Sequence, residues 1–183
     1  MKKTISLLIV GLGVIFSCKE KAKEAKTVSD SLSVATEIKE PEKENAQIIN
    51  STFDKIQQLT GAKNDTVYVT NYWATWCGPC VDEIPDFVAL QNEYKDKKVK
   101  FIFVNVDAPE DQQSEVIPFV QKNKMKNVYR IPVEELIAKI GSINPELAEG
   151  IPVTIIQKGD RKEGFLGSQP KVTVDAKIKE YLK

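Results

Sequence analysis

Hydrophobic residues follow two kinds of pattern along residues 47–183, and the two kinds alternate. Continuous apolar runs, rich in β-branched and aromatic residues, predict buried strands at residues 65–73 and 99–106. Between them, apolar side chains recur at helical spacing, so residues 77–95 are expected to form a helix kinked at Pro85. Because a right-handed crossover would bring the second strand beside the first, these segments predict a parallel βαβ unit.

Shorter patterns on either side of this unit predict the remaining elements. In chain order these are a helix from Ile48 to Leu59 that stops at Gly61, a helix over 110–123 that Pro118 bends or shortens, a helix over 133–140, a loop through Pro145, an antiparallel hairpin of 153–157 and 163–166, and a closing helix over 172–182. This order predicts an α/β fold with a central mixed β-sheet flanked by helices.

The first 17 residues have the pattern of an export signal. Lys2 and Lys3 precede an apolar run from Ile5 to Phe16. This run has about a dozen residues, whereas a helix needs about 20 to cross the bilayer core. Residues 1–17 are therefore interpreted as a signal peptide rather than as a permanent membrane span.

Residues 18–46 differ in composition from the segments on both sides. They are rich in Lys, Glu, Ala, Ser and Thr, and contain a single proline, Pro41. Such a segment buries too little apolar surface to fold alone. It is interpreted as a flexible charged linker with a reach of roughly 30 Å, with a solvated remnant of export as the open alternative. The folded domain is then expected to be residues 47–183.

The overall composition excludes several classes of protein. With 183 residues and 42% hydrophobic content, the chain suits one domain with additional segments. Lys plus Arg and Asp plus Glu number 26 each, and this neutral balance argues against a nucleic-acid partner. The chain has no histidine, which excludes Cys–His and Ser–His catalytic pairs and imidazole metal ligands. Its three cysteines are too few for a multi-disulfide scaffold.

Two of these cysteines, Cys77 and Cys80, form a C-x-x-C motif. Haem attachment would need histidine after the second cysteine, where the chain has Val81. Zinc would need two further ligands, but the chain has no histidine and only one other cysteine, so no metal is expected. No cofactor is expected beyond a redox-active disulfide. An inert structural disulfide remains the alternative to redox chemistry.

The predicted position of the motif, between a strand and a helix, favours redox chemistry. Unpaired N–H groups and the positive end of the helix dipole stabilise a thiolate at Cys77, which is therefore expected to be the attacking sulfur. Cys80 lies one turn further along and is expected to resolve the mixed disulfide. Pro79 has no N–H to leave unpaired in this first turn, and Gly78 gives a substrate backbone room to approach.

The segment from Trp73 to Cys80 resembles the active-site segment of thioredoxins. The extension from Val81 to Pro85, together with Asn71–Trp73, resembles the TlpA/ResA-type family of membrane-tethered thioredoxin-like proteins. The resemblance extends from about residue 46 to the C-terminus. It implies a thioredoxin-like fold and thiol–disulfide exchange with protein substrates.

This resemblance also implies roles for other residues. Ile151 and Pro152 would form a cis-proline loop that offers backbone hydrogen bonds to a substrate peptide, unless Pro152 is a trans-proline that opens the next strand. Trp76 would lie beside the cysteine pair and contribute to the substrate-binding surface. Glu83 would tune the cysteine pKa values or move protons, with a solvated helix carboxylate as the alternative. The stretch 142–149 departs from the family pattern, so the resemblance does not predict the substrate surface that this stretch forms.

The sequence from Ile15 to Cys18 resembles a bacterial lipobox. By this resemblance Cys18 would be lipidated and become the first residue of the mature protein. Two or three acyl chains would hold the protein stably on a membrane. An ordinary secretory signal with an incidental cysteine is the alternative. The predicted location is the bacterial cell envelope, with a lipid-anchored and monomeric domain in the periplasm.

The leading functional hypothesis is a reductase of protein disulfides that a membrane thiol–disulfide donor re-reduces. Apocytochrome c is the best-known substrate type of the family, which makes a role in cytochrome c maturation an expectation from resemblance alone. A disulfide oxidase or isomerase would use the same residues. A docking module with a structural disulfide, and a peroxidase, are the rivals from other classes.

Overall fold

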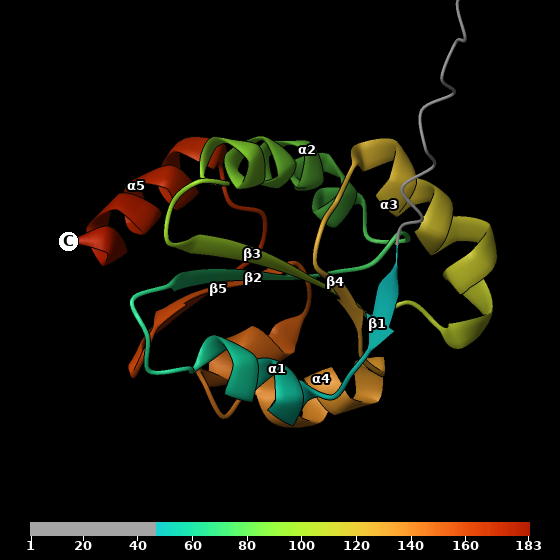
Figure 1. Cartoon of the computed structure of the whole chain (residues 1–183). Coiled ribbons are helices and arrows are strands. Elements are labelled where there is room, and N and C mark those ends of the chain that lie inside the picture. The colour runs from blue at the N-terminus through green and yellow to red at the C-terminus, as the bar shows by residue number, and fades with distance from the viewer. Residues whose placement is uncertain (1–46) are drawn as a thin grey trace, which may run out of the picture. The chain divides into compact units, whose positions relative to one another are not determined.

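The computed structural model describes residues 47–183, which form one six-stranded mixed sheet covered by helices on both faces (Figure 1). The strand order is β1-β4-β3-β2-β5-β6. The strands are β1 (Ile48–Asn50), β2 (Val67–Trp73), β3 (Val99–Asn105), β4 (Val128–Arg130), β5 (Val153–Lys158) and β6 (Arg161–Leu166). The predicted α/β class, with a central mixed sheet of thioredoxin type, is confirmed.

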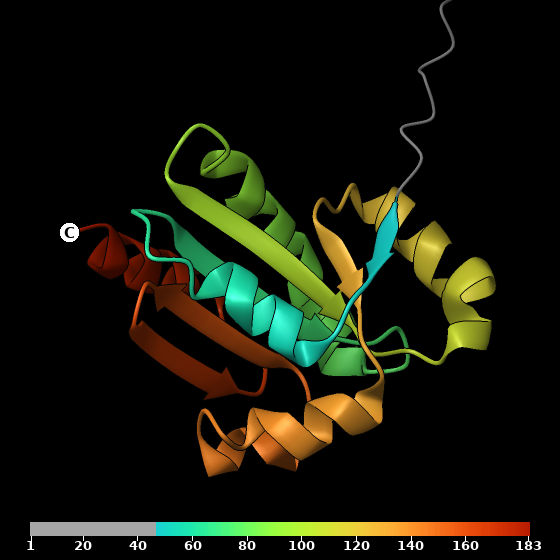
Figure 2. The same cartoon turned by 60° about the horizontal axis from the view of Figure 1, so that its bottom comes forward.

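The helices form two layers, one on each face of the sheet. They are α1 (Phe53–Thr60), α2 (Gly78–Glu93), α3 (Ile117–Asn123), α4 (Val133–Ile140) and α5 (Lys171–Leu182). Figures 1 and 2 show α2, α3 and α5 on one face and α1 and α4 on the other. The central strands are therefore covered on both faces, whereas the edge strands β1 and β6 contain no fully buried residue.

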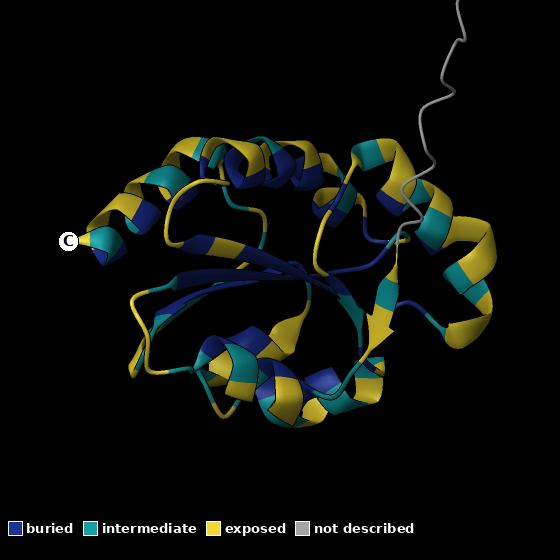
Figure 3. Ribbon diagram, viewed as in Figure 1, coloured by how far each residue is buried: buried dark blue, intermediate teal, exposed yellow. Residues whose placement is uncertain are grey.

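The predicted βαβ unit forms the centre of the domain. β2 and β3 pair in parallel from Val67 opposite Val99 to Trp73 opposite Asn105. All seven residues of β2 are buried, as are six of the seven in β3. Continuous apolar runs are typical of strands covered on both faces, and Figure 3 shows the buried colour running through the sheet. The hairpin of β5 and β6 is antiparallel, and β5 also pairs antiparallel with β2.

Two parts of the predicted element pattern are wrong. Ile48–Asn50 is not the start of a helix but strand β1, which pairs in parallel with the unpredicted strand β4, and the helix begins only at Phe53 after the Thr52 N-cap. The Thr52 hydroxyl accepts a hydrogen bond from the Lys55 N–H, and this cap sets the helix start. The pairing of two three-residue strands leaves almost no trace in the sequence, because each is too short to show a period.

The segment predicted as one helix over 110–123 is divided into three. A 3-10 turn (Pro109–Asp111) leads into a π-helical turn (Gln112–Val116), and only then does α3 begin, with Pro118 in its first turn. A proline without an N–H suits this position. The predicted loop through Pro145 contains a further 3-10 turn, Pro145–Glu149. Over residues 47–183, no helix is both long and apolar enough to cross a membrane.

Candidate redox-active site

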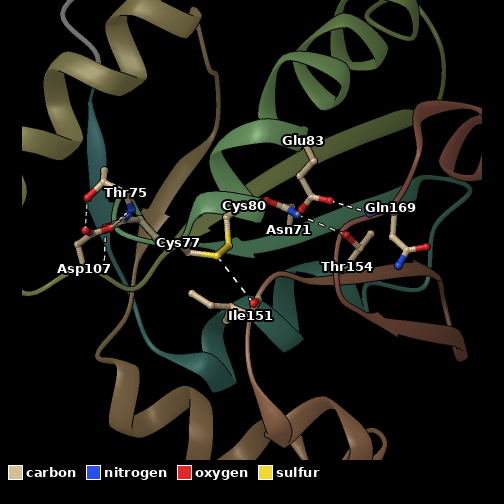
Figure 4. The surroundings of a disulfide bond; sticks show 10 residues. Asn71, Thr75, Cys77, Cys80, Glu83, Asp107, Ile151, Thr154 and Gln169 are labelled. Atoms are coloured by element: carbon tan, nitrogen blue, oxygen red, sulfur yellow. Dashed lines mark hydrogen bonds between the residues drawn. A yellow bond between two sulfur atoms is a disulfide. The ribbon is translucent and has the colours of Figure 1, made fainter.

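The two cysteines of the motif lie where β2 passes into α2, and they form a disulfide with an S–S distance of 2.03 Å (Figure 4). Cys77 is the N-cap of α2, and Pro79 lies in the first helical turn. The sulfur of Cys77 is therefore beside the unpaired N–H groups of a 16-residue helix, where a thiolate is stabilised. The predicted strand-to-helix position of the motif is confirmed.

The two cysteines differ in their exposure to solvent. Cys80 is fully buried, whereas 7% of Cys77 remains exposed. A Cβ placed on Gly78 would meet no atom within 4 Å, so the space over this part of the motif is open. Of the pair, only Cys77 therefore offers surface to an incoming sulfur.

The loop before β5 faces the disulfide. The Ile151–Pro152 peptide bond is cis, as the resemblance implied, and the trans alternative is wrong. The Cys77 Sγ lies 3.8 Å from the carbonyl oxygen of Ile151, and Figure 4 shows this oxygen directed toward the disulfide. A sulfur in a disulfide carries no hydrogen, so this is a contact in the oxidised protein. Trp76 is also at the surface here, with 63% of its area exposed.

Glu83 is buried, which corrects the alternative of a solvated helix carboxylate. It is 3% exposed and lies on α2, one turn beyond Cys80. Its carboxylate accepts hydrogen bonds from Asn71 Nδ2 at 2.7 Å and from the Gln169 N–H at 2.8 Å. Burial raises the pKa of Glu83 above its ordinary value, and these hydrogen bonds offset only part of that effect. Glu83 is therefore a buried acid that holds its proton to higher pH than a free glutamate.

Asn71 connects this carboxyl group to the strand that follows the cis-proline. It lies on β2 opposite Thr154 of β5, and its Nδ2 also donates to Thr154 Oγ1 at 3.3 Å. Within residues 47–183 the Asn71 Oδ1 has no hydrogen-bond partner although it is buried. A protonated Glu83 has an O–H to donate, and rotating the Asn71 amide by half a turn would present Oδ1 to it. The site can therefore accept either protonation state of Glu83.

Asp107 is a site residue that the sequence reasoning missed. It is 1% exposed, and its carboxylate accepts hydrogen bonds from the Thr75 N–H at 2.9 Å, from the Thr75 hydroxyl and from Asn105 Nδ2 at 2.6 Å. Thr75 lies two residues before Cys77, so Asp107 holds the turn that leads to this cysteine (Figure 4). A signal for it existed, because β2 and β3 are parallel and end at the same edge of the sheet.

Comparison with known proteins connects this geometry to a family. Residues 44–135 match the family named Redoxin, which is about half of the chain. The chain belongs to the redoxin family. It is 29% identical to the thiol-disulfide oxidoreductase ResA of Oceanobacillus iheyensis, over 87% of this redoxin and 83% of that protein. It is 31% identical to the thioredoxin-like protein YneN of Bacillus subtilis, over 66% of this redoxin and 67% of that protein.

A solved structure supports the fold of this redoxin independently. The thiol:disulfide interchange protein of Chlorobium tepidum, a thioredoxin family protein, superimposes with a TM-score of 0.58 at 24% identity. The match covers 68% of the redoxin and 85% of that chain. At this identity the likeness establishes the thioredoxin-like fold.

This redoxin is a thiol–disulfide oxidoreductase with Cys77 and Cys80 as its dithiol pair. The predicted residues Trp76 and Gly78 flank Cys77 along the chain, and the cis-proline loop contacts the Cys77 sulfur through the Ile151 carbonyl oxygen. Among residues 47–183, no group of three or more His, Cys, Asp or Glu side chains is arranged to hold a metal ion. The predicted lipidation site, Cys18, lies outside the described residues, as do the proposed signal peptide and linker.

Proposed function

We propose that this redoxin is a reductase of protein disulfides in the cell envelope. The observation that carries the proposal is the difference in position and exposure between Cys77 and Cys80. Cys77 is at the N-terminus of α2 and retains some exposure, while Cys80 is fully buried behind it. This arrangement suits one sulfur for attack on a partner and the other for an intramolecular second step.

In the reductive direction the Cys77 thiolate attacks one sulfur of the substrate disulfide. A new S–S bond forms between the two proteins, and the second substrate sulfur leaves as a thiolate that takes up a proton. Cys80 then attacks the Cys77 sulfur and releases the first substrate sulfur, which also takes up a proton. The substrate gains two electrons and two protons, and the redoxin ends with the Cys77–Cys80 disulfide that the structure contains.

Ile151 and Pro152 are proposed to hold the substrate backbone during this exchange. The contact of 3.8 Å between the Ile151 carbonyl oxygen and the Cys77 sulfur supports this role, because an extended peptide beside the loop would meet both groups. The exposed Trp76 side chain and the open space over Gly78 provide further contact surface. Pro79 lies in the first turn of α2, where it leaves no backbone N–H unpaired.

Glu83 is proposed to hold the proton that Cys80 must lose before it can attack. Its burial and its position one turn beyond Cys80 support this role, because a buried carboxyl with a raised pKa exchanges protons nearer neutral pH. The rate at which the mixed disulfide is resolved should therefore depend on pH in the parent and lose one ionisation in Glu83→Gln. Glu110→Gln, a change at an exposed glutamate, is the matched control. An unchanged pH profile in Glu83→Gln would remove Glu83 from the mechanism.

The direction of electron flow is tested by the equilibrium reduction potential of the Cys77–Cys80 pair against glutathione. A reductase should have a value near the roughly −270 mV of thioredoxin, whereas a value near roughly −120 mV would identify an oxidant. Replacing both cysteines with serine tests whether exchange matters in the cell. Full complementation by this folded double variant would leave only a docking role.

The envelope location and the role in cytochrome c maturation rest on the N-terminal pattern and on the family resemblance. Incorporation of labelled fatty acid into the full chain, and its loss in Cys18→Ser, would support the lipid anchor. If the substrate is apocytochrome c, a strain without the redoxin should lose covalently bound haem in its membranes, and an added chemical reductant should restore it. Normal haem content in that strain would exclude this substrate.

A further inference from the structure

An apolar hollow of about 120 Å³ lies beside the redox-active site. Its lining includes Trp76, the neighbour of Cys77 in the chain, and Ile151, whose carbonyl oxygen contacts the Cys77 sulfur. Ile137 of α4 and Leu147 of the 3-10 turn also line it. An engineered cavity of roughly 150 Å³ is enough to hold benzene, so this hollow has room for about one apolar side chain. The turn that completes it belongs to the stretch 142–149, where the sequence departs from its family.

Large apolar side chains are exposed to solvent around this hollow. The large apolar side chains that are exposed within residues 47–183 are Ile49, Trp76, Ile137, Leu166 and Val172. Two of these five line the hollow, Trp76 at 63% exposure and Ile137 at 60%. Clustered exposed apolar side chains mark interaction sites, whereas single ones are ordinary.

The hollow shares Ile151 with the surroundings of the Cys77 sulfur. The Ile151 carbonyl oxygen is 3.8 Å from the Cys77 sulfur, and Ile151 itself lines the hollow. An extended peptide advances about 3.3 Å per residue. A substrate whose cysteine reaches Cys77 therefore places a side chain one or two residues away at the mouth of the hollow.

The hollow is also built rigidly before any substrate arrives. Leu147 is 2% exposed and packs over Gly164 of β6, where an added Cβ would come within 2.5 Å of Leu147 Cδ1. The absence of a side chain at Gly164 thus allows the 3-10 turn to lie close against the sheet. A fixed wall lowers the cost of ordering when a ligand binds.

We propose that this hollow selects protein substrates that carry a large aliphatic side chain, such as Leu or Ile, within two residues of the reactive cysteine. The inference rests on the proposed function, because it describes how that same site chooses its substrate. Burial of one Leu side chain corresponds to about a ten- to hundredfold gain in the rate constant, if the contact is made in the transition state.

The test uses the reduced protein and peptide disulfides that differ only in one residue, Leu or Ser, placed one or two positions before or after the cysteine. Single-turnover rate constants are measured for each peptide and for glutathione disulfide. For at least one position the Leu peptide should react about ten- to hundredfold faster than its Ser counterpart. Ile137→Ser should lower that ratio toward one, while Val172→Ser, which removes an exposed apolar side chain on α5, should preserve it.

Two outcomes would overturn the inference, and they differ in what else they affect. Equal rates for Leu and Ser peptides at every position, with rapid oxidation of the dithiol by all of them, would refute the selective hollow alone. The same holds if Ile137→Ser keeps the full preference. Failure of every peptide and of glutathione disulfide to oxidise the dithiol would refute the proposed function as well.

Discussion

Replacing Glu83 with Gln tests whether ionisation of the buried Glu83 carboxyl destabilises the folded protein. Gln has nearly the same shape and can keep both hydrogen bonds, since its oxygen can accept from the Gln169 N–H and its amide can donate to Asn71 Oδ1 after rotation of that side chain. At low pH, where Glu83 is protonated, we expect the free energies of unfolding of parent and variant to agree within about 1 kcal/mol.

As pH rises, the free energies of unfolding of the parent and of Glu83→Gln should diverge. The pKa of Glu83 is raised by burial in the folded protein, so its contribution to stability is complete below the ordinary value and is lost as pH rises through the folded-state value. Between these two pKa values the parent should lose about 1.4 kcal/mol per pH unit relative to Glu83→Gln, and the difference should then become constant.

Urea unfolding of the oxidised proteins from pH 4 to 9 measures this difference directly. Using the difference removes the contribution of the other carboxylates, and Glu110→Gln provides the control at an exposed site. Glu83→Ala should cost about 2–4 kcal/mol, because it leaves the Gln169 N–H unpaired and creates a cavity. A difference between parent and Glu83→Gln that is flat with pH, or that favours the parent at high pH, would refute the reasoning.

Further substitutions at four positions test the hydrogen bonds and packing around the site by urea unfolding. Asp107→Ala should cost about 2–4 kcal/mol, because three donors lose their acceptor, and Asp107→Asn should cost less; an effect of Asp107→Ala under about 0.5 kcal/mol would contradict this. Gly164→Ala should cost about 1–3 kcal/mol in the parent and clearly less with Leu147→Ala present, so additive effects would exclude the contact. Phe87→Ala should cost about 3–5 kcal/mol because the ring is fully buried, and a cost under 1 kcal/mol would contradict its place in the core.

The parts of the fold that the sequence predicted are those whose pattern is local and long. β2, β3 and α2 each span seven residues or more, so their period shows in the sequence. β1 and β4 have three residues each, and the two strands pair across a long stretch of chain, as in Ile48 opposite Val128. Only the folded arrangement shows that these two segments pair.

The site divides in a similar way. Cys77 and Cys80 could be identified from their spacing and from the strand-to-helix transition. The cis bond before Pro152 came only from resemblance, because nothing in the local sequence selects that isomer. Thr154 needed the strand register, which places it opposite Asn71. The predicted parallel strands put Asp107 at the same edge of the sheet as the motif, but its hydrogen bond from the Thr75 N–H shows only in the folded chain. The burial of Glu83 likewise depends on the segment before α5, which lies 86 positions away.

The unequal access to the two sulfurs also limits the order of events in a catalytic cycle. Because Cys80 has no exposed surface, in the proposed cycle the thiol that reduces the Cys77–Cys80 disulfide has to attack Cys77, the same residue that is proposed to react with the substrate. The two exchange partners therefore cannot be bound at this sulfur together. Steady-state rates should follow double-displacement kinetics, with parallel lines in reciprocal plots, and an excess of either partner should inhibit the other.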